Sequence, residues 1–517
     1  MLVTRLVFIF FLGSLQVVYA QHNPIYDHLP VGKYDVGFRI FTVIDGSRVE
    51  RSSINYLGEK NTGDLRKKIT IHLWYPCQKH SDGRRLQYAD YCFNDRLHAS
   101  TDSLSSEIKN NQLASARRSV ENWFGKTSDQ NWNDLIHSPM LAQAEAEPIK
   151  TQWPLLIGIL RPVSTAITNE ILASNGFIVA MIHSEITGPF SETALTHIPD
   201  MQYVISWLQR AGMVNEEIGT FGFSGSGFSQ VLFAMRDFRV KALADIESGI
   251  YMNELFQALA LSNYYNPAKL RVPFLHIFSL DLSKQEKFIN EFEDKTIFSR
   301  RYRLLLNQPK LHHWDFAAEG FTASIFLGNR GEEKNNIRAS YEIACTYLLY
   351  YFEAELKKDS RAAQFIRDKS LLTNFPGRLW DIKYYDALKP APNRDELEYI
   401  IRARGIDSAL QMVNRTILRD STDNLWEWYV LNTLGYDFLN EGNYPAAIGI
   451  FKLNTELHPD DPNLFDSLAE AYERAGDLDN MKKTAGLVLS LLAAKPTLNA
   501  NEKGLQSNAE KRMKSNH

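Results

Sequence analysis

The sequence predicts a mostly parallel α/β domain followed by a purely helical repeat domain. Eight short, β-branched apolar runs alternate with helical patterns between about residues 36 and 355, and a 34-residue spacing of apolar positions follows them. Most of the later runs are continuously apolar, which is typical of strands buried on both faces of a parallel sheet. With 44% hydrophobic residues over 517 positions, the chain has enough apolar side chains for conventional cores, so a disordered or fibrous protein is excluded.

Charge and cysteine content exclude several function classes. Lys and Arg number 57 against 61 Asp and Glu, and the net charge of −4 lacks the basic excess of a nucleic-acid-binding protein. Three cysteines cannot build a disulfide scaffold, and no Cys-x-x-Cys pair indicates structural zinc or thioredoxin-type chemistry. Cys77 and Cys92 flank a polar loop; either a disulfide between them or two unpaired thiols fits the pattern, while Cys345 is expected to be a buried thiol.

The first twenty residues have the pattern of a signal peptide. Arg5 is followed by the apolar run Leu6–Leu12, and Val18–Ala20 precede Gln21 as a small-residue cleavage site. The apolar run is shorter than the roughly 18 residues needed to span a bilayer, and every later apolar run is interrupted by charge, Gly or Pro. We therefore expect an exported protein, periplasmic or secreted, without a membrane span.

The predicted α/β domain covers residues 21–356. Its eight strands are expected at Phe38–Ile44, Ile69–Tyr75, Leu155–Leu160, Phe177–His183, Ile218–Gly222, Ala242–Glu247, Phe274–Phe278 and Tyr302–Leu306. About seventy-five residues separate the second strand from the third, which is too many for a plain connection. Residues 93–150 are therefore predicted to form a helical insertion or cap, with helices at Ala114–Phe124 and Trp132–Gln143.

The C-terminal part has the spacing of tetratricopeptide-like repeats over residues 394–495. Six positions recur 34 residues later: Leu434, Gly435, Phe438, Ala447, Phe451 and Pro459 correspond to Leu468, Ala469, Tyr472, Met481, Ala485 and Ala493. Small residues let two antiparallel helices approach, and the aromatic residues fill the groove between them. A further helix pair is expected at Glu396–Leu418, a mixed linker at 357–393 and a frayed polar tail at 496–517.

A candidate nucleophile lies directly after the fifth predicted strand. The stretch Gly222–Gly227 reads GFSGSG and precedes an apolar helical run, which gives the order strand, tight turn, helix. A nucleophile elbow needs small residues two positions before and two after the nucleophile, and Gly222 and Ser226 supply them around Ser224. A glycine-rich turn with an idle serine remains an alternative. Phosphate binding fits less well, because neither the dinucleotide fingerprint nor a P-loop lysine is present.

A serine nucleophile requires a base and an acid that orients the base. His313, in the sequence LHHWDF after the eighth strand, occupies the place where a C-terminal catalytic histidine is expected. The His-His doublet lacks partners at metal-ligand spacing, so we expect no metal or cofactor. Three carboxylates stand near strand ends as candidates for the acid: Asp245 and Glu247 after the sixth strand and Asp281 after the seventh.

Residues 30–350 resemble the platelet-activating-factor-acetylhydrolase-like and dienelactone-hydrolase-like branch of the α/β-hydrolases. The resemblance rests on the stretches WPLLIGI, ILASNGFIVAMIH, GFSGSG, DFRVKALADIE and HHWDF. It implies an α/β-hydrolase fold in which Ser224 matches the family's nucleophile, Glu247 its catalytic acid and His313 its histidine. Asp245 and Asp281 stay as alternative acids.

The oxyanion loop departs from the family pattern. The resemblance implies one donor at the Gly225 N–H and a second from a His-Gly loop after the third strand, but here that loop reads Leu160–Val163 with a proline at 162. Because proline has no N–H, Arg161 or Val163 has to supply the second contact, or activity is low.

Three functions are therefore predicted. The first is an esterase for small-molecule or glycan-linked esters, with repeats that bind a protein partner or a second copy. The second is a catalytically weak or inactive hydrolase-fold protein that acts as an interaction module through its repeats. The third is a lactone or amide hydrolase.

Overall fold

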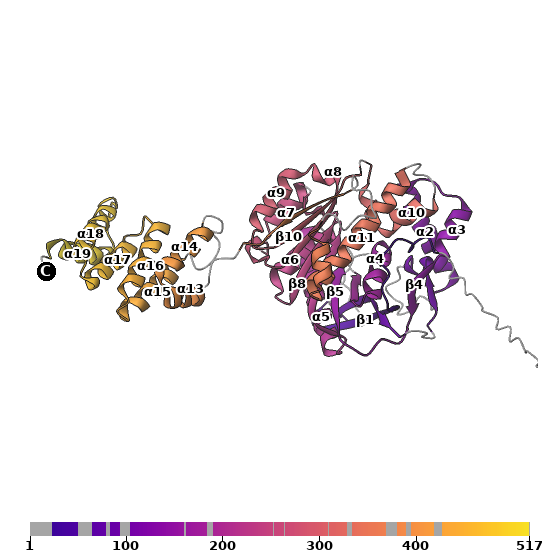
Figure 1. Cartoon of the computed structure of the whole chain (residues 1–517), viewed down its shortest axis with the longest axis horizontal. Helices are drawn as coiled ribbons and strands as arrows, with labels where there is room; N and C mark the ends of the chain where they lie inside the picture. Colours follow the sequence, from indigo (N-terminus) through magenta and orange to yellow (C-terminus); the bar gives the residue numbers. More distant parts are fainter. Residues whose placement is uncertain are drawn as a thin grey trace, which may run out of the picture. The chain divides into compact units, whose positions relative to one another are not determined.

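The computed structural model describes residues 23–49, 65–78, 83–93, 104–159, 162–183, 190–251, 253–262, 264–308, 310–327, 333–368, 380–388, 394–417 and 427–515. The chain forms two compact units. The first contains the sheet and extends to Asp386, and the second contains the helices after Ala387 together with Pro267–Arg271 and Lys295–Ser299 (Figure 1). The predicted signal peptide at residues 1–20 lies outside the described part of the chain, so export stays a prediction.

A single mixed sheet of eleven described strands organises the first unit. The strands are β1 Asp35–Val49, β2 Arg66–Cys77, β3 Arg85–Gln87, β4 Pro139–Ala144, β5 Trp153–Ile159, β6 Ile178–His183, β7 Val214–Phe223, β8 Val240–Ile246, β9 Phe274–Ser279, β10 Arg301–Leu306 and β11 Trp380–Tyr385. Their order across the sheet is β11-β10-β9-β8-β7-β5-β6-β2-β1-β4-β3. All eight predicted strands are present, as β1, β2 and β5 to β10.

The six strands β5 to β10 run parallel to one another. Each of the neighbouring pairs β6·β5, β5·β7, β7·β8, β8·β9 and β9·β10 is parallel, whereas β2 pairs antiparallel with both β6 and β1. The continuously apolar strands are therefore the central ones, where both faces are covered. The mostly parallel α/β sheet agrees with the predicted fold class.

Helices cover this sheet in two groups. Those of the first unit are α1 Tyr88–Tyr91, α2 Ser106–Phe124, α3 Asp129–Ile136, α4 Pro162–Ser174, α5 Phe190–Arg210, α6 Ser226–Arg236, α7 Asn253–Ala260, α8 Leu280–Ser283, α9 Glu286–Lys295, α10 Ala318–Phe326, α11 Lys334–Leu356 and α12 Ser360–Phe365, with short 3-10 helices η2 Gly249–Tyr251 and η4 His313–Phe316. A further 3-10 helix, η3 Pro267–Lys269, falls in the second unit. The helices α5 and α6 pack on each other and on β5 and β7, while α4 and α11 pack on each other, α4 on β2 and β6 and α11 on β7, β8 and β9. The result is a layered α/β unit.

A predicted helix and a predicted linker need correction, because each contains a strand. The predicted helix Trp132–Gln143 ends at Ile136, and strand β4 begins at Pro139, because a proline disfavours helical geometry in the residue before it. The predicted linker 357–393 contains α12 and β11, and β11 pairs antiparallel with β10 from Arg301↔Tyr385 to Leu306↔Trp380. The first unit therefore ends about thirty residues later than the predicted boundary at 356.

A buried carboxylate fastens the insertion to the sheet unit. Glu170 of α4 accepts hydrogen bonds from the Tyr26 hydroxyl, from the Tyr91 hydroxyl at 2.6 Å, and from the Leu141 and Ala142 N–H groups at 3.0 Å. Tyr91 and β4 belong to the segment between the second and third predicted strands. Because four donors satisfy both carboxylate oxygens, the insertion has a fixed polar attachment to α4.

Seven helices form the described part of the second unit. They are α13 Arg394–Arg404, α14 Ile406–Ile417, α15 Trp428–Asn440, α16 Tyr444–Leu457, α17 Pro462–Ala475, α18 Leu478–Ala493 and α19 Ala500–Lys514. The starts of α15 and α17 are 34 residues apart, and so are those of α16 and α18. Gly442 and Gly476, also 34 residues apart, both have positive φ, of 78° and 76°, at the turn that follows the first helix of each pair.

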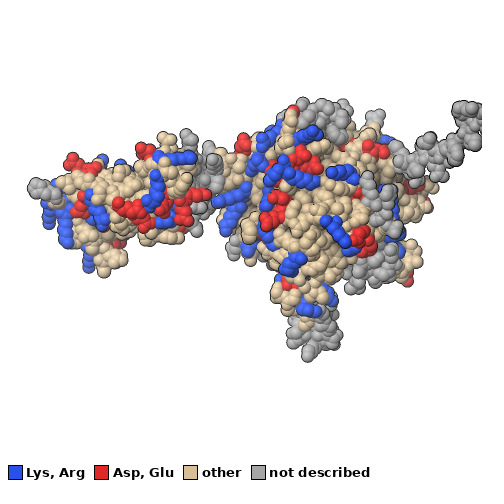
Figure 2. Space-filling model, turned by 60° about the horizontal axis from the view of Figure 1, so that its bottom comes forward, with Lys and Arg blue, Asp and Glu red and all other residues tan. Residues whose placement is uncertain are grey.

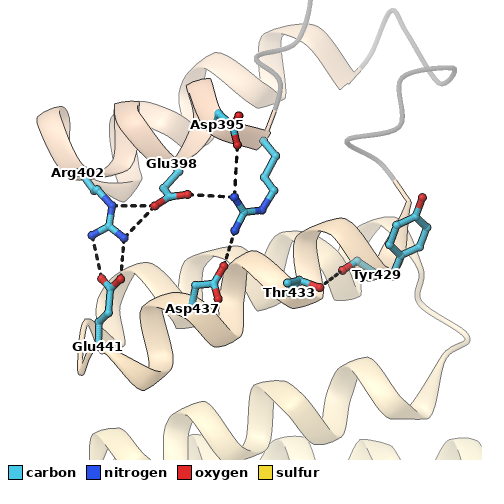
Figure 3. A network of polar contacts seen from close by, with 8 residues as sticks. Asp395, Glu398, Arg402, Tyr429, Thr433, Asp437 and Glu441 are labelled. Atoms are coloured by element: carbon cyan, nitrogen blue, oxygen red, sulfur yellow. Dashed lines mark hydrogen bonds and ion pairs between the residues drawn. The ribbon is translucent and has the colours of Figure 1, made fainter.

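Close packing between α15 and α16 depends on a glycine. A Cβ at Gly435 would lie 2.5 Å from the Phe451 ring, so the two helices approach at this point as the spacing predicts. A network of ion pairs joins α13 to α15 on the surface (Figure 3). In it Arg402 bridges Glu398 and Glu441 at 2.8–3.0 Å, and Arg394 contacts Glu398 at 3.2 Å and also Asp437.

The predicted frayed tail at 496–517 is wrong for most of its length. Residues 500–514 form helix α19, which starts with a capping box between Asn499 and Glu502. Arg512 is 9% exposed and donates to Asp466 at 2.5 Å and to Glu473 at 2.8 Å, both on α17. The polar composition hid this helix because its attachment is ionic and includes few apolar side chains.

Three further observations concern the remaining sequence predictions. Cys77, Cys92 and Cys345 are all buried, and none of them is in a disulfide in the structure.

Within the described ranges, no helix is both long and apolar enough to cross a bilayer. Acidic and basic side chains alternate over the face shown in Figure 2, and neither sign covers it, in line with the net charge of −4.

Candidate active site

The candidate residues follow the carboxyl ends of three parallel strands. Ser224 comes directly after β7, Glu247 directly after β8, and His313 begins η4 after β10. Phe223 and Ile246 are paired in register, so the residues that follow them leave the sheet side by side. The Ser224 N–H donates to the Ile246 carbonyl at 3.0 Å, which continues this pairing into the turn.

Ser224 lies at a strained turn between β7 and α6. Its φ is 59°, in the left-handed region that a serine adopts only where the surroundings hold it. A Cβ at Gly222 would lie 2.8 Å from Ser226 Oγ and 2.9 Å from the Gly227 nitrogen, so only glycine fits there without displacement. This backbone has the features of a nucleophile elbow.

Ser226 stabilises the turn in the place where the family pattern has a second glycine. Its hydroxyl contacts the Phe223 N–H at 2.9 Å and the Phe223 carbonyl at 2.8 Å. The Gly249 N–H also donates to the Ser224 carbonyl at 3.2 Å. The substitution of serine for glycine therefore supports the turn through hydrogen bonds.

The structure brings Ser224, His313 and Glu247 into one hydrogen-bonded line. His313 Nε2 lies 2.7 Å from Ser224 Oγ, and His313 Nδ1 lies 3.3 Å from Glu247 Oε2. The His313 ring also stacks on Phe223, with centroids 4.8 Å apart and planes 19° apart. Because both ring nitrogens face a partner and one ring face is covered, the orientation of the imidazole is well defined.

Glu247 is held by the end of strand β9 as well as by its own strand. Its N–H donates to the Ile277 carbonyl at 2.8 Å, and its Oε1 accepts a short hydrogen bond from the Ser279 N–H. The side chain is only 5% exposed, and the residue has a φ of 49°. One carboxylate oxygen is thus fixed by the backbone, and the other is directed at His313.

The two alternative acids have other partners. Asp245 is buried and pairs with His276 Nδ1 at 3.2 Å, and burial raises the pKa of its carboxyl. Asp281 lies in the first turn of α8, is 58% exposed, and forms an ion pair with Lys284 at 2.6 Å. Neither carboxylate takes the position at His313 Nδ1 that Glu247 occupies.

Aromatic side chains connect the histidine to the insertion. Trp314 lies edge-on to His313 at 5.6 Å and to Phe223 at 5.8 Å, measured between ring centroids. The ring of Trp123, at the end of α2, lies 5.6 Å from that of Trp314. Helix α2 of the insertion therefore borders the His313 side of the site.

The candidate oxyanion donors are described only in part. Gly225 is the N-cap residue of α6, and Val163 is the second residue of α4, which begins at Pro162. The first N–H groups of a helix have no acceptor within that helix, so the Val163 N–H is not used by α4. Arg161 lies outside the described residues.

The described residues do not suggest a metal centre or a cofactor cradle. No group of three His, Cys, Asp or Glu side chains among them is arranged to hold a metal ion. His312, the other half of the doublet, caps η4, and its N–H donates to Asp315 at 2.7 Å. The arrangement is suited to nucleophilic attack by a hydroxyl that a histidine deprotonates.

The sequence predictions did not include the residues that support the hydrogen-bonded line of Ser224, His313 and Glu247. Phe223 stacks on His313, the Ser279 N–H donates to Glu247, and His276 pairs with Asp245. Phe223 is the residue before the nucleophile, so its place next to the site follows from the elbow motif. No local signal marks Ser279 or His276, because their roles depend on strand order.

Comparison with known proteins gives little further information. Neither a family model nor any curated protein matches the chain. Among solved structures, a ferulic acid esterase from Streptomyces cinnamoneus is similar, with a TM-score of 0.46 and 17% sequence identity, over 69% of this chain and 98% of that one. At this distance the similarity supplies no information on the substrate or on catalytic residues.

Proposed function

We propose that the chain is a serine hydrolase of the α/β-hydrolase fold that cleaves carboxylic ester bonds. The observation that carries the proposal is the line of Ser224 Oγ, His313 Nε2 and Nδ1, and Glu247 Oε2, with separations of 2.7 and 3.3 Å. The second separation is slightly longer than a tight N–H···O bond, as is common in sites without substrate.

In this mechanism Ser224 attacks the ester carbonyl while His313 Nε2 takes the serine proton. Glu247 accepts the Nδ1–H of the imidazole, which keeps Nε2 free to act as the base and stabilises the imidazolium that forms. Collapse of the tetrahedral intermediate transfers that proton to the leaving alkoxide and leaves an acyl group on Ser224. Water, deprotonated by His313, then releases the acid and restores the serine.

Two hydrogen-bond donors are needed to stabilise the negatively charged oxygen of the tetrahedral intermediate. We assign one to the Gly225 N–H, at the start of α6, and the other to the Val163 N–H, at the start of α4. The partial positive charge at the start of a helix favours an anion at both places. A missing second donor would lower kcat roughly 10²- to 10³-fold, and in that case the sheet unit would support the repeats in the interaction role of the second predicted function.

Export and partner binding complete the proposal on sequence grounds. The pattern of residues 1–20 favours an exported enzyme, periplasmic or secreted. The 34-residue offsets between helix starts support a tetratricopeptide-like module that binds a protein partner or a second copy.

The test is hydrolysis of 4-nitrophenyl acetate by the purified chain under stopped flow. If an acyl-enzyme forms faster than it is hydrolysed, we expect a burst of 4-nitrophenol of about one equivalent per chain before the steady rate. A correctly folded protein with no turnover above the spontaneous rate would contradict the proposal. Parallel assays with a lactone and an anilide distinguish the third predicted function.

A further inference from the structure

A cavity of about 240 Å³ lies between the insertion and the layer of α4 and α10. Tyr88 of α1, Gln112 of α2, Trp132 of α3, Val163 of α4 and Glu319 of α10 are among its lining residues. With roughly 30 Å³ for each water-sized group, the cavity has room for about eight non-hydrogen atoms. It is therefore large enough for one half of a small ester.

Ser224, His313 and Glu247 are not among the lining residues, but three walls of the cavity belong to elements that border the Ser224 centre. Val163 is the residue to which the second oxyanion contact is assigned. Glu319 lies in the first turn of α10, just after η4, and α10 packs so tightly on η4 that a Cβ at Gly320 would overlap the Trp314 carbonyl oxygen. Helix α2 reaches the site through Trp123 and Trp314. A group in this cavity can thus belong to a molecule whose ester carbonyl is at Ser224.

The polar lining of the cavity includes one carboxylate, which only accepts hydrogen bonds, together with hydroxyl and amide groups that can donate or accept them. Glu319 is the one charged residue among the lining residues, and its Oε1 accepts from Ser164 at 2.9 Å. Tyr88 is 1% exposed and its hydroxyl lies near Thr322, but neither that hydroxyl nor Gln112 Oε1 makes a hydrogen bond of normal geometry among the described residues. Burial and the nearby Glu319 charge both raise the pKa of Tyr88, so its hydroxyl keeps its proton.

A buried hydroxyl without a partner costs free energy, which a ligand recovers when it supplies the missing hydrogen bond. A carboxylate beside aromatic walls favours a group that donates hydrogen bonds, either a hydroxyl or an ammonium. The buried faces of Trp132 and Tyr88 favour an apolar body next to that group.

We propose that this cavity is a specificity pocket for a substrate part of about eight non-hydrogen atoms, with an apolar body and a hydrogen-bond-donating end that Glu319 and Tyr88 hold. The proposal rests on the proposed function, because it places the rest of the substrate at Ser224. The donor is a hydroxyl or an ammonium, and the experiment distinguishes the two.

The test measures binding without turnover. Titration of the Ser224→Ala chain, followed by protein tryptophan fluorescence and ligand-observed NMR, compares 2-phenylethanol, 2-phenylethylamine and the donor-free 2-phenylethyl methyl ether. We expect at least one donor ligand to bind roughly ten- to a hundredfold more tightly than the ether. Selection of the amine alone identifies an ammonium pocket, and selection of the alcohol identifies a hydroxyl pocket.

Substitutions of lining residues test whether the cavity determines the preference for donor ligands. Glu319→Gln removes the charge at nearly constant shape and is expected to reduce the preference for the donor ligand at least tenfold, whereas Glu107→Gln, on the exposed side of α2, leaves it unchanged. Ala116→Leu, which fills part of the cavity, should weaken all three ligands and serves as the second variant if Glu319→Gln does not fold. The pocket proposal would be contradicted if the ether bound as tightly as both donor ligands. It would also be contradicted if both Glu319→Gln and Ala116→Leu kept the full preference for a donor ligand over the ether. Since these measurements need no catalysis, they can fail while the hydrolase proposal stands.

Discussion

Replacement of Ser224 by alanine is expected to lower kcat for 4-nitrophenyl acetate by roughly 10⁴- to 10⁶-fold. The hydroxyl is the only atom group that the substitution removes, and the elbow backbone, with its hydrogen bond from the Ser224 N–H to Ile246, stays as it is. Without the nucleophile, water has to attack the ester directly, and only the oxyanion donors and substrate binding still accelerate the reaction. The measurement is the steady-state rate, with near-ultraviolet circular dichroism to show that the fold is intact.

Ser206→Ala is the matched control for this substitution. Ser206 is a half-buried serine on α5 whose hydroxyl accepts from Arg239 at 2.9 Å, away from the three candidate residues. We expect its kcat to stay within about twofold of the unmodified chain, as for substitutions outside the site. If Ser224→Ala retained full activity, Ser224 would not be the nucleophile.

Glu247→Gln should lower kcat by about 10⁴-fold, nearly as much as loss of the nucleophile. A glutamine can present its NH₂ group to His313 Nδ1, which stabilises the tautomer whose Nε2 carries the proton and cannot act as a base. The Ser279 N–H still needs an acceptor, so the amide oxygen is expected at the present Oε1 position and the NH₂ group toward the histidine. The substitution thus changes the tautomer of His313 but leaves the shape of the site unchanged.

Asp281→Asn provides the comparison for the acid. This carboxylate also follows a parallel strand, but it is 58% exposed and paired with Lys284, so its substitution should leave kcat unchanged within error. The reverse outcome, a large loss at Asp281 and a small one at Glu247, would assign the acid to the end of β9.

The central strands were predictable because their signal is local. Continuous apolar runs such as those of β5 and β6 can be satisfied only by burial on both faces, which defines a parallel sheet core. The edge strand β11 alternates polar and apolar residues in a segment with a linker-like composition, and its pairing with β10 is a long-range contact. Helix α19 was missed for a related reason, since Arg512 attaches it to Asp466 and Glu473 through charge.

The candidate site was predictable to the level of residue type and order, but the residue pattern alone left three candidates for its acid, and only the family resemblance favoured Glu247. Motif and chain order pointed to Ser224 and His313, whereas Asp245, Glu247 and Asp281 all stood at strand ends. The choice depends on His276, which comes from the neighbouring strand β9 and pairs with Asp245, and on the backbone of Ser279, which fixes Glu247. Such contacts across strands are set by register, which has no signature in a single strand.

Labelling with a fluorophosphonate tests the serine hydrolase assignment most directly. An activated serine attacks the phosphorus, fluoride leaves, and the phosphonyl group stays on the oxygen. We predict one adduct per folded chain, located by peptide mass spectrometry at Ser224 and absent after His313→Ala or prior denaturation. A folded chain that remains unlabelled, or one that carries the adduct on another residue, would contradict the assignment of Ser224, His313 and Glu247 as a catalytic triad.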